Sequence, residues 1–126
     1  MVGYEDYPVN FYPMRFSFDD IALLKRTAPN QVIISDGQAF NWQLVPEDRA
    51  PSANELRVLT YSEMAAGAKG VLFYTYYDGA EYTGAWNLPE VWEASKVLKN
   101  ELQEYSRIIV HKIPLTTELF FPSSIL

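Results

Sequence analysis

Cysteine is absent from this chain of 126 residues, and histidine occurs only once, at His111. The lack of cysteine excludes a disulfide framework, a thiolate zinc site and a cysteine nucleophile. A single histidine excludes a multi-histidine metal site, and any Ser-His-Asp triad would have to use His111. No glycine-rich phosphate loop is visible either. We therefore expect neither a metal nor a cofactor, and no catalytic role for His111 near the end of the chain.

Basic residues are also scarce, and long apolar runs are missing. The 10 Lys and Arg residues are outnumbered by 16 Asp and Glu residues, which gives a net charge of −6. Nucleic acids and anionic membranes are bound through basic patches, so neither is an expected partner. No apolar run reaches the roughly 18–20 residues that cross a bilayer, and the N-terminus lacks the pattern of a signal peptide. Localisation stays open, with a secreted or periplasmic parent protein as one alternative.

The remaining composition favours a folded domain with a surplus of aromatic side chains. Hydrophobic residues make up 48% of the chain and aromatic residues 15%. The hydrophobic share is enough for a sizeable core. Most aromatic rings are expected in that core, and the others are candidates for stacking against sugars or other ring-bearing ligands.

Strand and helix signals alternate along the chain. Strands are expected before Tyr7-Pro8 and over residues 31–36, 70–77 and 107–113. Helices are expected from a cap at Ser17 to Pro29, from the capping box Ser52-Ala53-Asn54-Glu55 to about Gly67, and from Pro89 to about Tyr105. The alternation predicts an α/β fold in which helices cover parallel strands.

Four short motifs, in the correct order, carry a resemblance to a known family. They are Glu5-Asp6-Tyr7-Pro8, Gln38-Ala39-Phe40-Asn41-Trp42, the helix start from Arg49 to Arg57, and Gly67-Ala68-Lys69-Gly70. Over residues 1 to about 110 the chain resembles a (β/α)8-barrel family of glycoside hydrolase-like proteins. The resemblance implies that residues 1–105 are about the last three βα units of a TIM barrel, with about three parallel strands and alternating helices. Residues 106–126 would be a short strand or tail that begins a truncated β-type region.

The resemblance also implies a sugar-processing site at the carboxyl ends of the strands, where acids gather. The catalytic candidates are Glu5, Asp6, Asp36 and Asp78, with Glu5 or Asp6 opposite Asp36 or Asp78. Glycoside hydrolysis uses two carboxylates across the sugar. At the seventh-strand position, where retaining barrel glycosidases usually carry the nucleophile, this chain has Gln38, and an amide is no nucleophile. The acid/base residue that retaining barrel glycosidases usually carry on the fourth strand would lie outside this chain. Alternatively, Asp6 and Asp78 cap loops or pair with Arg49 or Arg57.

Seven residues are candidates for contact with a substrate. They are Tyr7, Gln38, Trp42, Arg57, Tyr74, Tyr76 and Trp86. The two tryptophans follow strand ends, so they either stack on a sugar or roof the core under a loop. Tyr74 and Tyr76 are expected to share a strand face with Asp78. Arg57 either orients an acid over the strand ends or is an exposed helix residue.

Two functions remain open at this point. The first is carbohydrate processing by a fragment of an O-glycosyl hydrolase that is inactive alone, and the second is a non-catalytic carbohydrate-binding or scaffold fragment. Three βα units cannot close a barrel and leave the inner sheet face bare, with Val32, Ile34, Val71 and Phe73 among the exposed groups, depending on the register of the strands. The expected partners are therefore carbohydrate and either the missing barrel half or a second copy of the chain.

Overall fold

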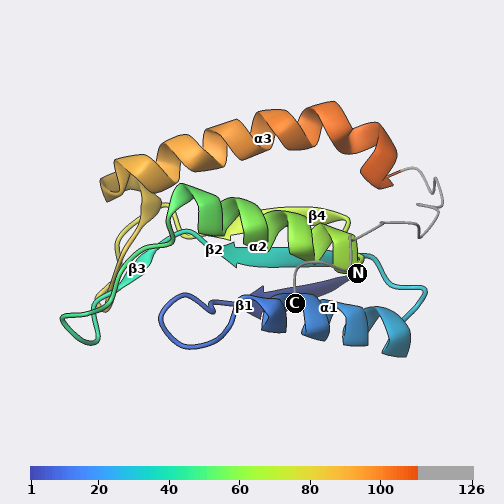
Figure 1. Cartoon of the computed structure of the whole chain (residues 1–126), viewed down its shortest axis with the longest axis horizontal. Coiled ribbons are helices and arrows are strands. Elements are labelled where there is room, and N and C mark those ends of the chain that lie inside the picture. The colour runs from blue at the N-terminus through green and yellow to red at the C-terminus, as the bar shows by residue number, and fades with distance from the viewer. Residues whose placement is uncertain (111–126) are drawn as a thin grey trace, which may run out of the picture.

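The computed structural model describes residues 1–110 and shows a mixed α/β fold (Figure 1). Its elements in chain order are β1 (Val2–Asp6), α1 (Arg15–Thr27), β2 (Ile33–Gln38), β3 (Asn41–Trp42), α2 (Ala53–Ala66), β4 (Gly70–Tyr74), β5 (Tyr82–Thr83), the short 3-10 helix η1 (Ala85–Asn87) and α3 (Pro89–Val110). None of the helices in this part of the chain is long and apolar enough to cross a membrane.

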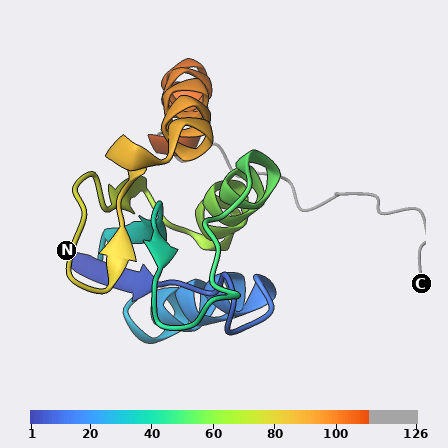
Figure 2. The ribbon, with the colours of Figure 1, turned by 90° about the vertical axis from the view of Figure 1, so that its left-hand side faces the viewer.

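The three longer strands form one parallel sheet in the order β1-β2-β4. The helices α1, α2 and α3 lie side by side along one face of this sheet, in the same order as the strands (Figures 1 and 2). β3 and β5 form a separate antiparallel pair beyond the carboxyl ends of β2 and β4. The predicted alternation of parallel strands and helices is therefore confirmed, while residues 1–110 form no closed barrel.

The sequence signals at both ends of α2 are present in the structure as predicted. Ser52 Oγ accepts a hydrogen bond from the backbone N–H of Glu55, and a Glu55 carboxylate oxygen accepts one of 2.9 Å from the N–H of Ser52. This capping box satisfies two backbone donors at the helix start. Hydrogen bonds from Arg49 hold the pKa of Glu55 at about 2. At the other end Gly67 adopts a φ of 122°, which glycine tolerates best, and the helix stops there.

Two predictions about the other helices are wrong. α1 begins at Arg15, so Ser17 lies inside the helix, where it is buried and donates its hydroxyl to Asp6 on β1. The helix expected to end near Tyr105 continues to Val110, where a strand was expected from residue 107. Extending an existing helix needs no new nucleation, and this outweighs the weak strand preference of β-branched residues. Residues 111–126, with His111 and the rest of the expected strand, lie outside the described residues.

Side chains alternate between a face of the sheet covered by helices and an open face. Ile33 is buried on the covered face with Ile21 of α1 and Ala68. Val71 and Phe73 were expected on the bare face, but alternation along β4 turns them towards α3, and Leu72 is exposed instead. Ile34 lies on the open face in register with Gly70, and Val32 is exposed before β2 begins.

Candidate functional site

Two carboxylates stand side by side on the open face of the sheet. Glu5 of β1 and Asp36 of β2 are register partners, and both side chains point away from the helices. Glu5 is exposed and Asp36 is half-buried. Tyr7, which follows β1, lies beside Asp36, and its hydroxyl favours the ionised form of the Asp36 carboxyl group. The structure therefore brings together one of the predicted acid pairs, Glu5 with Asp36.

The surroundings favour the protonated forms of both Asp36 and Tyr7. Burial raises the pKa of Asp36, and the nearby charge of Glu5 raises it further, against the opposing effects of the Tyr7 hydroxyl and the Tyr74 backbone. Burial and the charge of Asp36 raise the pKa of Tyr7, so its hydroxyl remains a hydrogen-bond donor at neutral pH. A carboxyl group beside a like charge gains a proton more readily than an isolated one, which suits it to proton transfer.

The other two candidate acids are used elsewhere in the fold. Asp6 points to the covered face and accepts the hydrogen bond from Ser17. Asp78 organises the loop after β4, accepting hydrogen bonds of 2.9 Å from the N–H of Gly84 and 2.6 Å from the side-chain amide of Asn87. Asp78 therefore caps a loop, as the structural alternative expected, whereas Asp6 joins β1 to α1, a role that neither reading expected.

Aromatic rings gather at the carboxyl edge of the sheet, beside the acid pair. This aromatic edge cluster consists of Tyr7, Phe40, Trp42, Tyr74 and Tyr82. Phe40 is fully buried at its centre, with its ring 4.7 Å from that of Trp42. The rings of Tyr7 and Tyr74 stack at 5.9 Å, and the hydroxyls of Tyr74 and Tyr82 are 3.0 Å apart.

Sequence reasoning missed Phe40 and Tyr82 as parts of this cluster. Phe40 lies within the Gln38–Trp42 motif, which was a usable signal, but nothing in the sequence indicates that β5 pairs with β3 and brings Tyr82 to Trp42.

A pocket of about 420 Å³ lies beside the cluster along residues 41–46 and Asp48. Asn41 and Trp42 line this pocket, and their Oδ1 and Nε1 atoms are buried without a hydrogen-bond partner among the described residues.

Gln38 has a structural role in this fold. Its side chain is fully buried, with Oε1 accepting a hydrogen bond of 3.0 Å from the N–H of Val9 and Nε2 donating to the carbonyl of Phe40 at 3.4 Å. The amide therefore joins the ends of β1 and β2 beneath the aromatic edge cluster, and it does not reach the open surface.

The remaining substrate-binding candidates lie away from the acid pair. β4 ends at Tyr74, earlier than predicted, so Tyr76 leaves the sheet and packs against Trp86 at 5.5 Å and Trp92 at 5.2 Å. The expected shared face of Tyr74, Tyr76 and Asp78 is therefore not formed. Arg57 of α2 forms an ion pair with Glu101 of α3 on the helical side of the molecule.

The described residues hold no group of three or more His, Asp or Glu side chains that could bind a metal ion. No protein-family model, no curated protein and no solved structure matches the chain.

Proposed function

We propose that the carboxyl edge of the sheet binds carbohydrate, with β1, β2 and β4 as consecutive strands of a (β/α)8 barrel of the glycoside hydrolase-like kind. The observation that carries this proposal is the pairing of Glu5 and Asp36 in register on the open face, next to the aromatic edge cluster. Ligands of parallel α/β folds bind at the carboxyl ends of the strands. Aromatic rings stack on the apolar faces of sugars, and carboxylates act on the glycosidic bond.

The pair of Glu5 and Asp36 supports the reading in which the site cleaves the sugar as well as binding it. Neighbouring strands are about 4.8 Å apart. Retaining glycosidases place their two carboxyl groups about 5–5.5 Å apart, so register partners on adjacent strands fall in a suitable range. In this role Asp36, held by Tyr7, is the group that exchanges a proton, and Glu5 is the charged partner.

Gln38 supports the alternative of binding without cleavage. Gln38 lies two residues after Asp36 on β2, at the position where the resembling family carries its nucleophile. Both polar atoms of its side chain form hydrogen bonds within the fold. In this alternative Glu5 and Asp36 accept hydrogen bonds from sugar hydroxyls and transfer no proton, while the aromatic edge cluster supplies the stacking surface.

Titration of the chain with neutral oligosaccharides, followed by two-dimensional NMR, tests the proposal. We expect shifts at Glu5, Asp36 and Tyr74, and loss of binding in Tyr74→Ala. The matched control is Tyr77→Ala, because Tyr77 is 72% exposed and lies outside the cluster. Absence of binding, or equal loss in both variants, would contradict a sugar site at this edge.

A second assay separates the two forms of the proposal. The chain is incubated with aryl glycosides, and release of the phenol is measured for wild type, Glu5→Gln and Asp36→Asn. Turnover that disappears in both variants and survives in Asp19→Asn, on the surface of α1, supports processing. Sugar binding without turnover is expected both of the non-catalytic alternative and of a processing fragment that is inactive alone, so only turnover that depends on Glu5 and Asp36 excludes the non-catalytic alternative.

A further inference from the structure

A row of exposed aromatic side chains continues from the aromatic edge cluster to the start of α1. The ring of Phe11 contacts that of Trp42, which belongs to the cluster, with 6.4 Å between the ring centroids. Phe11 in turn contacts Tyr12 at 6.3 Å, and Tyr12 contacts Phe16 of α1 at 6.1 Å. Phe11, Tyr12 and Phe16, which we call the outer aromatic row, are therefore joined to the cluster ring by ring.

The side chains of the outer aromatic row are open to solvent. All three are between 46% and 60% exposed. Contiguous apolar patches on a protein surface mark binding sites more often than scattered apolar residues do. Successive rings from Trp42 to Phe16 are tilted by 48–73° to one another. The row is therefore a series of separate stacking surfaces and not one flat wall.

The loop that carries Phe11 and Tyr12 is fixed by hydrogen bonds. The backbone N–H groups of both residues donate to the carbonyl of Pro8, each at 2.9 Å. The side-chain amide of Asn10 donates to the carbonyl of Arg49 at 3.1 Å, and Asn10 adopts a φ of 85°, which asparagine tolerates better than most residues. A surface that is fixed before binding loses less conformational entropy when its ligand binds. The loop therefore presents its two rings in one arrangement.

The outer aromatic row lies at the same end of the molecule as the acid pair. The loop between β1 and α1, drawn in blue, is at the end where β3 lies (Figure 1). Tyr7, which lies beside Asp36, contacts Trp42 with 6.4 Å between the ring centroids, and Trp42 contacts Phe11. A continuous path of rings therefore leads from Glu5 and Asp36 to the outer aromatic row.

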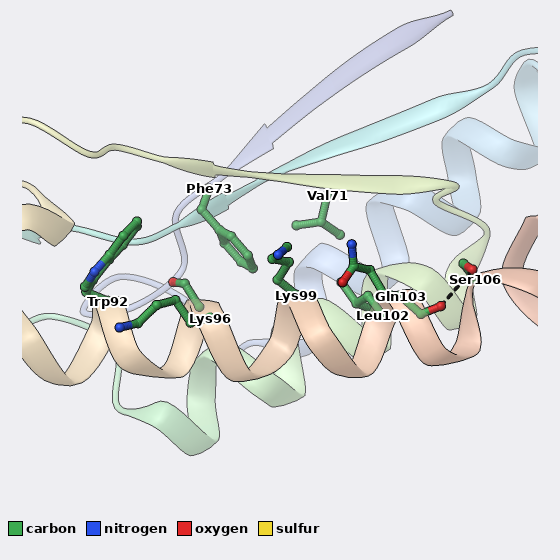
Figure 3. A pocket seen from close by; sticks show the side chains of 9 residues that line it. Val71, Phe73, Trp92, Lys96, Lys99, Leu102, Gln103 and Ser106 are labelled. Atoms are coloured by element: carbon green, nitrogen blue, oxygen red, sulfur yellow. Dashed lines mark hydrogen bonds between the residues drawn. The ribbon is translucent and has the colours of Figure 1, made fainter.

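The largest apolar hollow between β4 and α3 is separate from this path. It is a groove of about 440 Å³ into which Phe73 and Trp92 point (Figure 3). The ring of Trp92 contacts that of Tyr76 at 5.2 Å. Among the described residues, no ring contact joins Trp92 or Tyr76 to the outer aromatic row. The row therefore continues the candidate site, and the groove does not.

We propose that the outer aromatic row binds a neutral polysaccharide that extends to it from Glu5 and Asp36. This inference rests on the proposed carbohydrate site and names its substrate class, which is a ligand of several linked sugar units and not a single sugar or a disaccharide. Successive sugar rings offer their apolar faces to successive aromatic rings. The charge of Glu5 and the net charge of −6 disfavour an acidic polysaccharide, because like charges repel.

Calorimetric titration of the full chain with disaccharides and hexasaccharides of glucose, mannose and xylose tests the proposal. For a sugar that binds, we expect the hexasaccharide to bind at least about tenfold more tightly than the disaccharide, because it also reaches the outer aromatic row. Tyr12→Ala is expected to lower the hexasaccharide affinity about threefold or more and to leave the disaccharide affinity unchanged. Phe16→Ala should act in the same way, whereas Tyr74→Ala, within the aromatic edge cluster, should weaken the binding of both ligands.

Phe18→Ala is the matched control for Tyr12→Ala. Phe18 lies on α1 and is 38% exposed, but its ring contacts none of the rings in the outer aromatic row. Both affinities should therefore equal those of wild type in this variant. A loss of hexasaccharide affinity in Phe18→Ala as large as in Tyr12→Ala would overturn the proposal, and so would an equal loss of both ligands in Tyr12→Ala.

Three further results would overturn the proposal. Equal affinity for the disaccharide and the hexasaccharide excludes the extended site but leaves the proposed function in place, provided that Tyr74→Ala weakens both. Absence of binding by every oligosaccharide overturns the proposed function and this inference together. Self-association of the wild type that Tyr12→Ala removes, measured by sedimentation, assigns the outer aromatic row to contact with a second copy of the chain.

Discussion

Gln38 and Val9 connect the carboxyl ends of two neighbouring strands through one buried hydrogen bond. The side-chain oxygen of Gln38 accepts from the backbone N–H of Val9 at 3.0 Å, and both residues are almost completely buried. A buried N–H without a partner costs free energy, so this bond fixes the path of the chain after β1. Tyr7, which is two residues before Val9, is thereby held next to Asp36.

Replacing Gln38 by leucine is expected to destabilise the fold. The variant keeps a side chain of similar size but leaves the N–H of Val9 unsatisfied, which costs about 1–3 kcal/mol. Chemical denaturation measures the change in the free energy of unfolding. Gln43→Leu is the control, because Gln43 is exposed and surface substitutions usually change stability by less than about 0.5 kcal/mol. Equal stability of the two variants would contradict a structural role for Gln38.

The parts of the fold that could be predicted are those set by local chemistry. The capping box at Ser52 and Glu55 and the glycine at position 67 involve residues close in sequence, and all are found as expected. Ser17 carries the same capping chemistry, but its hydroxyl is used by Asp6 on another element. A sequence shows that a side chain can cap a helix, and it does not show which distant partner competes for that side chain.

In the candidate site, too, the local features could be predicted and the long-range ones could not. Alternation along a strand places Glu5 and Asp6 on opposite faces, but the face covered by helices is decided by packing, here of Ile33 against Ile21. The register that sets Glu5 beside Asp36 is likewise a long-range property. Tyr82 joins the aromatic edge cluster only because β5 folds back on β3. Each of these relationships joins segments far apart in sequence, and this is why sequence patterns left four acids as equal candidates.

Gly84 is expected to tolerate no side chain. A Cβ at this position would lie 2.3 Å from the carbonyl oxygen of Tyr77, so the backbone of the loop would have to move. The N–H of Gly84 also binds Asp78, and the movement would disrupt this contact. Gly84→Ala should therefore lower the thermal midpoint, with a free-energy cost of about 1–3 kcal/mol for an overpacked site.

Gly3→Ala provides the matched control for Gly84→Ala. A Cβ on Gly3 meets nothing within 4 Å, and the residue lies in β1 with ordinary strand geometry. Reduced freedom of the unfolded chain should make this variant as stable as wild type or more stable, by about 0.4–1 kcal/mol. A similar loss of stability in both variants would show that the close approach of Gly84 to Tyr77 is not the cause.

Arg57 is expected to support helix packing and to have no part in sugar binding. It forms an ion pair with Glu101 that joins α2 to α3, and the Glu101 carboxylate also accepts a hydrogen bond of 2.9 Å from Tyr61. The Arg57 side chain is half-exposed, so Arg57→Gln should lower the free energy of unfolding only slightly, and this loss should shrink at high salt. Oligosaccharide titrations of the variant should match wild type, and a changed affinity would assign Arg57 to the site.

Glu63 is expected to make the protein less stable as the pH rises. It lies on α2 with only 1% of its surface exposed, and its Oε2 atom has no hydrogen-bond partner among the described residues. Ser35 Oγ of β2, also fully buried, has none either. Burial, together with the charges of Asp6 and Asp36 on the neighbouring strands, raises the pKa of Glu63 to about 7.

The direction of the pH effect follows from the raised pKa of Glu63. The folded protein holds a proton that the unfolded chain releases near pH 4.5, so the stabilisation is complete below pH 4.5 and is lost as the pH rises through about 7. This difference between the pKa values of the unfolded and folded states corresponds to about 3 kcal/mol in the free energy of unfolding. Urea unfolding between pH 4.5 and 8 should show this decline in wild type and a weaker one in Glu63→Gln, which is neutral throughout. The slope that remains is expected from Asp36, whose pKa is also raised, and Glu63→Gln,Asp36→Asn should remove it. An unchanged slope in Glu63→Gln would contradict a buried, protonated Glu63.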